Sequence, residues 1–200
     1  MITDYDDVII FGASNIVNNT DLIHSMLSPK IRIIPTYTFD ELKENIHLLG
    51  DEKIILLHIN TNDIQKLCKQ YFKSDIVKEI EIEKMAKEYS KFVLNLIHER
   101  PYFKVMISLT LPRRDLDHQT GFSNPNQARK KLNKEIIFLL KKHPQIFFID
   151  NDSVISRDNG TLKQDGFHVN FFGAKLMIGL VAQTLDLVLG KDFKNIVVQL

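Results

Sequence analysis

The sequence predicts one α/β domain in which helices cover both faces of a parallel β-sheet, giving three layers. Short apolar runs rich in β-branched and aromatic residues alternate with helical patterns along all 200 residues. These runs are continuous, which is typical of strands covered on both faces. About one domain is expected at this length, and the sequence shows no linker, repeat or low-complexity segment, so residues 1–200 are expected to form a single domain.

Five strands and six helices are expected, in alternation. The apolar runs read DVIIF, KIRIIP, KIILLHI, FKVMISL and QIFFID, at residues 7–11, 30–35, 53–59, 103–109 and 145–150. Helical patterns cover residues 19–27, 39–48, 64–73, 78–99, 126–142 and 172–189. The pattern at 78–99 spaces its apolar residues to cover the sheet and leaves its charges outside. Such alternation requires right-handed crossovers, and therefore a parallel sheet.

Composition narrows the class of protein. Hydrophobic residues make up 44% and charged residues 26%, as in an ordinary globular protein. The net charge of +1 does not steer the chain as a whole to nucleic acid or to an anionic membrane. The only cysteine, Cys68, excludes an internal disulfide and fits a reducing compartment. The start, MITDYDDVIIFG, lacks the basic region of a signal peptide, and no membrane span is expected, so we predict a cytoplasmic protein.

Polar residues follow the predicted strands, at the edge where open parallel sheets bind ligands. After the first strand, FGASN places Ser14 at the start of a helix, where an anion or a developing oxyanion is stabilised. After the third strand, HINTND places the amide of Asn62 at the same edge. Taken singly, both residues are also ordinary helix caps.

The late stretch QDGFHVNFFGAKL adds an acid and a base, Asp165 and His168, before the last helix. A serine hydroxyl becomes a good nucleophile only when a base takes its proton and a carboxylate orients that base. A lone Asp-x-x-His is more often a cap beside a surface histidine. The order of Ser14, Asn62 and Asp165-x-x-His168 together favours a catalytic triad.

The three blocks FGASN, HINTND and DGFHVN resemble those of the SGNH (GDSL-type) hydrolases over nearly the whole chain. The resemblance implies a flavodoxin-like three-layer sandwich with a five-stranded parallel sheet. It also implies hydrolysis of a small ester through an acyl-enzyme. Ser14 would be the nucleophile, His168 the base and Asp165 its orienting acid. Asn62 would complete an oxyanion hole with the backbone N–H of Ser14.

Three positions depart from the family pattern. Ala13 replaces an Asp, Asn60 replaces a Gly, and the second block has Tyr37 between two threonines where the family has an oxyanion-binding Gly. Loss of glycine narrows the crevice and can misdirect a donor. The OSK-type domain of the insect protein Oskar resembles the same family, lacks a working triad and binds RNA. The alternative prediction is therefore an inactive SGNH-like domain that binds RNA or a protein partner.

Basic residues supply the candidate surface for that alternative. A possible nucleic-acid patch lies on the 126–142 helix and comprises Arg129, Lys130, Lys131 and Lys134. A solvated helix face with extended lysines is the commoner explanation of such a pattern. Arg113 and Arg114 end the fourth strand and are expected either to contact an anion in the crevice or to pair with Asp115 or Asp117.

No cofactor or metal is expected. The chain has no Walker or GxGxxG loop, and its other histidines lack metal-ligand spacing.

Overall fold

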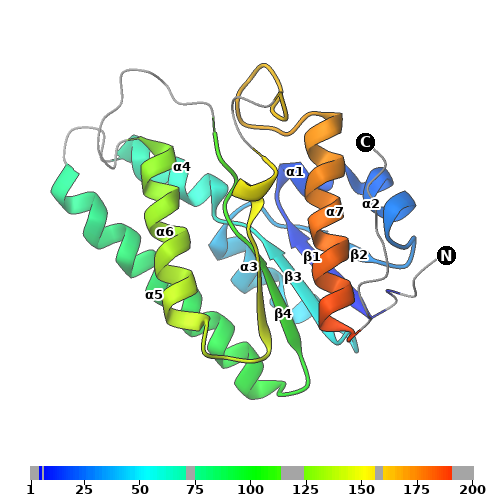
Figure 1. Ribbon diagram of the computed structural model, residues 1–200. Helices are drawn as coiled ribbons and strands as arrows, with labels where there is room; N and C mark the ends of the chain where they lie inside the picture. Colours follow the sequence, from blue (N-terminus) through cyan, green and yellow to red (C-terminus); the bar gives the residue numbers. More distant parts are fainter. Residues whose placement is uncertain (1–4, 6, 71–74, 114–123, 156–159, 191–200) are drawn as a thin grey trace.

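A computed structural model describes residues 5, 7–70, 75–113, 124–155 and 160–190. The described chain forms three layers, with a five-stranded parallel sheet between two layers of helices (Figure 1). The strands are β1 (Val8–Gly12), β2 (Arg32–Pro35), β3 (Ile54–His58), β4 (Lys104–Ser108) and β5 (Ile146–Ile149). Their order in the sheet is β2-β1-β3-β4-β5, with every neighbouring pair parallel.

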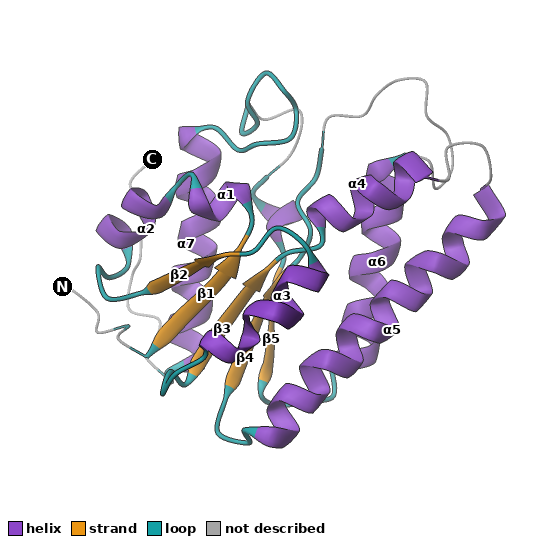
Figure 2. Ribbon diagram, turned by 180° about the vertical axis from the view of Figure 1, so that it is seen from behind, coloured by secondary structure: helices purple, strands orange, loops and turns teal. Residues whose placement is uncertain are grey.

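The helices divide between the two faces of the sheet, as Figure 2 shows from behind. One face carries α1 (Ser14–Val17), α2 (Thr20–Met26) and α7 (Phe171–Val188). The other carries α3 (Phe39–Asn45), α4 (Thr61–Gln70), α5 (Asp75–Glu99) and α6 (Pro125–Leu140). Short 3-10 helices span Ile46–Leu48 and Asn151–Ser153.

Alternate residues of the strands feed two separate cores. Ile9 and Phe11 of β1 pack into a cluster with α3 to α6, whereas Ile10 packs into a cluster with α2 and α7. Burying each such side chain contributes about 1.5–3 kcal/mol. The prediction of strands covered on both faces is confirmed.

The predicted elements are all present, and two short helices among the described residues, α1 and the 3-10 helix Asn151–Ser153, were not predicted. Each predicted strand and helix overlaps an observed one, but α1 was not predicted because a helix of four residues is too short to show a periodic pattern. Helix α4 starts at Thr61, earlier than the apolar pattern indicated.

Helix α7 packs closely against the segment that precedes it. A Cβ atom on Gly173 would lie 2.2 Å from the carbonyl oxygen of Thr161, so only glycine fits there. Asn170 caps the helix by accepting a hydrogen bond from the Gly173 N–H at 2.9 Å. By length and composition α7 could cross a membrane, contrary to the sequence prediction, but its inner residues Met177, Ile178 and Leu185 lie in the second core.

Candidate active site

Ser14 lies at the junction of β1 and α1, at the carboxyl edge of the sheet. A Cβ atom on Gly12 would lie 2.5 Å from the Cβ of Ile16, so the strand turns directly into α1 only because residue 12 is glycine. The Ala13 N–H donates to the carbonyl of His58 at 3.1 Å and ties this turn to β3. The backbone of Ser14 is therefore fixed by its neighbours on both sides.

The late loop brings Asp165 and His168 to that serine. His168 Nε2 lies 3.0 Å from Ser14 Oγ, and His168 Nδ1 lies 2.8 Å from Asp165 Oδ2. Both distances are within hydrogen-bond reach, as a nucleophile–base–acid chain requires. The structure thus brings together residues that are 154 positions apart in the sequence.

Asp165 is held in its ionised form. Its Oδ1 accepts the backbone N–H of His168 at 3.0 Å and that of Phe167 at 2.8 Å. These two hydrogen bonds, with the one to the His168 ring, hold the pKa of Asp165 well below its usual range. An ionised carboxylate orients the ring so that Nδ1 carries the proton and Nε2 faces the serine as an acceptor.

The loop that carries both residues is pinned by backbone hydrogen bonds. The Lys163 N–H donates to the His168 carbonyl at 2.7 Å, Leu162 and Val169 form an antiparallel bridge, and the Asn170 N–H donates to the Thr161 carbonyl at 3.0 Å. These contacts close residues 161–170 into a narrow hairpin-like turn. His168 therefore lies on a segment held in place by backbone hydrogen bonds.

Asn15 connects that turn to the serine, a role that the sequence analysis did not assign. Its Oδ1 accepts the Val169 N–H at 3.0 Å, and the side chain is only 4% exposed. The bond joins the residue after the serine to the residue after the histidine. The sequence signal that could have identified this role is the polar residue directly after Ser14, which is buried in α1.

Asn60 occupies the position of the family's third-block glycine and adopts the backbone conformation of a glycine. Its φ is 76°, the only positive value among the described non-glycine residues. Asn tolerates this conformation better than most residues, so the chain keeps its course at the end of β3. Asn62 is partly exposed and lies in the first turn of α4, just after β3, which is the neighbour of β1 in the sheet.

The second block has lost two backbone donors to internal hydrogen bonds. The Thr36 N–H donates to the Gly12 carbonyl at 3.0 Å, and the Tyr37 N–H donates to Glu41 Oε2 at 2.7 Å. The Tyr37 side chain is 38% exposed. These two N–H groups are therefore engaged and are not free to bind an oxyanion.

A second Ser–His pair lies buried beneath the site. His58 Nδ1 lies 2.7 Å from Ser108 Oγ, which also accepts a hydrogen bond from Asn151 Nδ2 at 2.9 Å. Burial lowers the pKa of His58 to about 4, so the ring is neutral at pH 7. All three side chains are buried, so this cluster ties β3, β4 and the end of β5 together and does not face a substrate.

Arg113 lies between two segments of the site. It is 5% exposed, its Nη2 donates to the Thr61 carbonyl at 3.2 Å, and its guanidinium lies 4.9 Å from the centre of the Phe167 ring. Arg113 thus joins the start of α4 to the residue before His168, and its contact with an anion stays a prediction. Arg114, Asp115 and Asp117 lie outside the described residues.

The predicted nucleic-acid patch is not a free cationic face, and the assignment of Arg129 to it is wrong. Arg129 is 4% exposed and pairs with Asp152 at 2.8 Å. Lys131 is surrounded by Glu79, Glu83 and Glu135, at 3.3, 3.0 and 3.0 Å. Lys130 and Lys134 remain exposed and share a groove with Asp150 and Asp152. Buried or compensated cations cannot neutralise phosphates.

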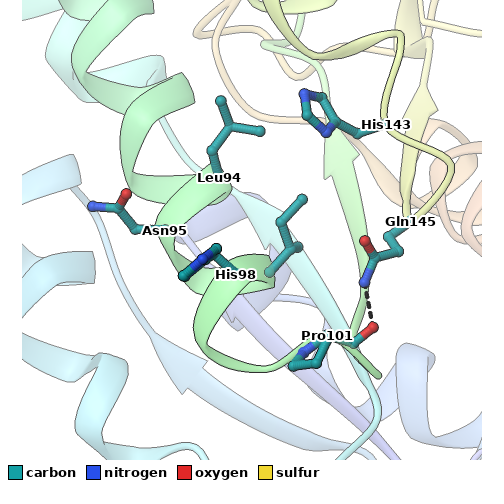
Figure 3. A pocket seen from close by; sticks show the side chains of 7 residues that line it. Leu94, Asn95, His98, Pro101, His143 and Gln145 are labelled. Carbon is teal, nitrogen blue, oxygen red and sulfur yellow. Dashed lines mark hydrogen bonds between the residues drawn. The ribbon is translucent and has the colours of Figure 1, made fainter.

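The cavity in Figure 3 lies away from the serine. It is formed by the end of α5 and the turns that lead into β4 and β5, at the amino ends of the strands. Its lining residues are Leu94, Asn95, Ile97, His98, Pro101, His143 and Gln145. Among the described residues, no group of three His, Cys, Asp or Glu side chains is placed to hold a metal ion.

Comparison with known proteins supports the fold. No family model matches the sequence, and no curated protein matches it. Solved structures do. A GDSL-like lipase from Bacteroides thetaiotaomicron is 16% identical with a TM-score of 0.60, covering 92% of this chain and 90% of its own. A lipase/acylhydrolase from Enterococcus faecalis is 17% identical with a TM-score of 0.60, covering 89% and 94%. A family 3 carbohydrate esterase from Clostridium thermocellum is 13% identical with a TM-score of 0.62, covering 92% and 96%.

This chain has the SGNH-hydrolase-like fold. The sheet order, the parallel strands and the matches over about nine-tenths of the chain agree on it. At identities of 13–17% the likeness shows the fold alone. The arrangement of Ser14, His168 and Asp165 is shown by the two hydrogen-bond distances within this chain.

The backbone of Asn60 gives a first test of the altered SGNH-like third block. Asn60→Ala should lower the free energy of unfolding by about 1–2 kcal/mol relative to Asn60→Gly, because alanine resists a positive φ and glycine does not. Both substitutions remove the buried Oδ1 atom, which has no hydrogen-bond partner, so the comparison isolates the backbone. Urea denaturation measures it, and equal stability of the two variants would contradict the argument.

Asp63 gives a test in the pH dependence of stability. Its Oδ2 accepts the Phe39 N–H at 3.1 Å, and burial raises its pKa to about 6, above the ordinary 3.8. The folded state therefore holds a proton that the unfolded state has lost, and this group's contribution to stability falls as pH rises from about 4 to 6.

Asp63→Asn keeps an oxygen that can accept the Phe39 N–H but cannot ionise. The variant should therefore not lose stability as the pH rises from about 4 to 6. We expect the variant to be more stable than the parent by on the order of 2 kcal/mol at pH 8, or about 4–8 °C in Tm, with a difference well under 1 kcal/mol at pH 4. Thermal denaturation of both proteins at the two pH values measures it. A Tm difference that does not change with pH would refute the assignment.

Proposed function

We propose that this protein is a serine-dependent acyl-ester hydrolase that works through a covalent acyl-enzyme. The observation that carries the proposal is the continuous hydrogen-bond chain Ser14–His168–Asp165, with links of 3.0 and 2.8 Å. The fold supports it, because solved structures named as a lipase, a lipase/acylhydrolase and a carbohydrate esterase share it. Small esters are the proposed substrates.

The residues account for each proton in the reaction. His168 Nε2 takes the Ser14 hydroxyl proton while Oγ attacks the ester carbonyl, and Asp165 stabilises the resulting imidazolium. The tetrahedral intermediate collapses to the acyl-serine, and the imidazolium gives its proton to the departing alcohol. Water then attacks the acyl-serine, with His168 again acting as base, and the acid is released as Ser14 regains its proton.

Transition-state stabilisation depends on few donors. The Ser14 N–H and the Asn62 amide are the proposed oxyanion donors, because the Thr36 and Tyr37 N–H groups are engaged elsewhere. Loss of one such donor typically lowers turnover by about a hundred- to a thousandfold. We therefore expect a slow hydrolase, active on substrates with small acyl groups.

The RNA-binding alternative gains no support from the contacts of the basic helix. Arg129 is buried against Asp152, and Lys131 is paired with three glutamates. The triad geometry, which a pure binding domain does not need, favours the hydrolase.

Removal of the nucleophile is the direct test. Ser14→Ala should abolish labelling by a fluorophosphonate and reduce turnover of p-nitrophenyl acetate to the uncatalysed rate, because no other described serine lies against His168. Ser108→Ala is the matched control: it removes the serine of the buried Ser–His pair and should still be labelled. Equal labelling of Ser14→Ala and the parent would refute the proposal. Loss of labelling only in Ser108→Ala would refute it too, and would identify Ser108 as the reactive serine.

Asn15 provides a second test, as a positioning residue. Asn15→Leu leaves the Val169 N–H buried without an acceptor and should lower kcat by roughly 10- to 100-fold while KM stays within about twofold. Asn15→Asp keeps the acceptor and should recover most of the rate. Steady-state kinetics with p-nitrophenyl acetate measures both variants. A folded Asn15→Leu protein with the parent's kcat would contradict this role.

A further inference from the structure

Strand β5 forms one edge of the sheet, with no strand beyond it among the described residues. It bonds to β4 through the Val105 N–H, which donates to the Gln145 carbonyl at 2.8 Å, and the Leu109 N–H, which donates to the Ile149 carbonyl at 3.0 Å. Backbone groups alternate in direction along a strand, so the N–H and the carbonyl of Phe148 are directed away from β4. A strand edge with free backbone groups is a template for pairing with another chain.

A groove lies along this edge, between β5 and α6. Figure 1 shows β5, in yellow, between α6 and α7. The α6 side chains that line the groove follow the i, i+3, i+4, i+7 spacing of one helix face, and the others come from the ends of β4 and β5. The lining residues are Leu109, Lys130, Asn133, Lys134, Ile137, Phe148, Asp150 and Asp152. The aliphatic and aromatic members are buried or half-buried, whereas the charged members are exposed.

The helix side of the groove is held in place by contacts within the chain. Asn133 Oδ1 accepts the Thr110 N–H at 3.1 Å, and Asn133 Nδ2 donates to the Thr110 carbonyl at 3.2 Å, just after β4. Arg129, one turn earlier in α6, pairs with Asp152 at 2.8 Å and so ties the helix to the segment after β5. The groove is therefore formed in the absence of a ligand, which lowers the entropic cost of binding.

The groove carries opposite charges on its two sides. Lys130 and Lys134 are exposed on the helix side, and Asp150 is exposed just past the end of β5. Phe148 and Asp150 are two positions apart, so both side chains face the α6 side of the sheet. A chain laid along β5 therefore meets an aromatic surface, a carboxylate beside it and two ammonium groups across the groove. This pattern fits a peptide of mixed charge, whereas the uniformly anionic RNA backbone would be repelled by Asp150 and Asp152.

We propose that this groove binds an extended peptide segment of a partner protein, which adds to the sheet as a further strand beside β5. The backbone of Phe148 gives and accepts hydrogen bonds with the peptide, and the groove selects an apolar residue flanked by an acidic and a basic one. Strand β5 lies three strand spacings, roughly 14 Å, from β1. The peptide would thus bind beside the Ser14 site, and the inference does not depend on the proposed esterase activity.

Peptide selection tests the groove. Random dodecapeptides displayed on phage are selected against the parent protein, and the enriched peptides are synthesised with a fluorophore for fluorescence polarisation. The double variant Lys130→Glu/Lys134→Glu should raise their Kd by roughly fivefold or more, because two attractive pairs become repulsive. Lys142→Glu is the matched control: this exposed lysine follows α6 outside the groove, and its reversal should change Kd by less than about twofold. Failure to enrich any peptide, or affinities that the double reversal leaves unchanged, would overturn the proposal.

Backbone methylation of an enriched peptide tests strand addition itself. Only alternate peptide N–H groups can face β5, so N-methylation at those positions should raise Kd by roughly tenfold or more, and at the intervening positions by less than about twofold. Hydrogen exchange of the Phe148 amide, followed by NMR, should slow when the peptide binds. Equal effects at all peptide positions would overturn strand addition. Sedimentation of the parent alone tests the other occupant: a dimer that the double reversal dissociates would mean that a second copy occupies the edge, and would overturn the peptide proposal.

Discussion

The parallel direction of all five strands is the constraint on which the rest of the molecule depends. It sends every strand's carboxyl end to one edge, and the order β2-β1-β3-β4-β5 sets β1 beside β3, with β4 next to it. Ser14, Asn62 and Arg113 are distant in sequence, yet each follows one of these three strands. Crossover helices on both faces enforce the parallel arrangement, and the two cores of buried side chains hold those helices in place.

The late turn completes the site through hydrogen bonds more than through hydrophobic burial. Asp165 is fixed by two backbone N–H groups of its own turn, and His168 is fixed by Asp165. Asn15 and the Gly173–Thr161 contact then hold the turn against α1 and α7. A histidine held by hydrogen bonds at 3.0 Å from a serine hydroxyl is a geometry that catalysis uses and that a helix cap does not require.

The departures from the family's blocks differ in their physical consequences. Asn60 reproduces the backbone conformation of the glycine that it replaces, so this change preserves the path of the chain. In the second block the N–H groups of Thr36 and Tyr37 bond to Gly12 and Glu41, so neither is free to bind an oxyanion. The hydrogen-bond chain of Ser14, His168 and Asp165 is thus intact, whereas two backbone donors of the second block are engaged elsewhere.

The sequence by itself determined the fold class, the approximate limits of the strands and the three residues that the structure joins by hydrogen bonds, Ser14, His168 and Asp165. Continuous apolar runs identify buried strands, and the ordered blocks around Ser14, Asn62 and His168 resemble a known arrangement. Only the tertiary structure decided which basic side chains are exposed and which are buried or paired with carboxylates. Arg129 and Lys131 lie on a helix that reads as basic, but their partners Asp152, Glu79 and Glu83 come from other elements, and no local pattern reveals them. The same holds for Asn15 and for the buried His58–Ser108 pair, because their partners are 154 and 50 residues away and packing alone brings them together.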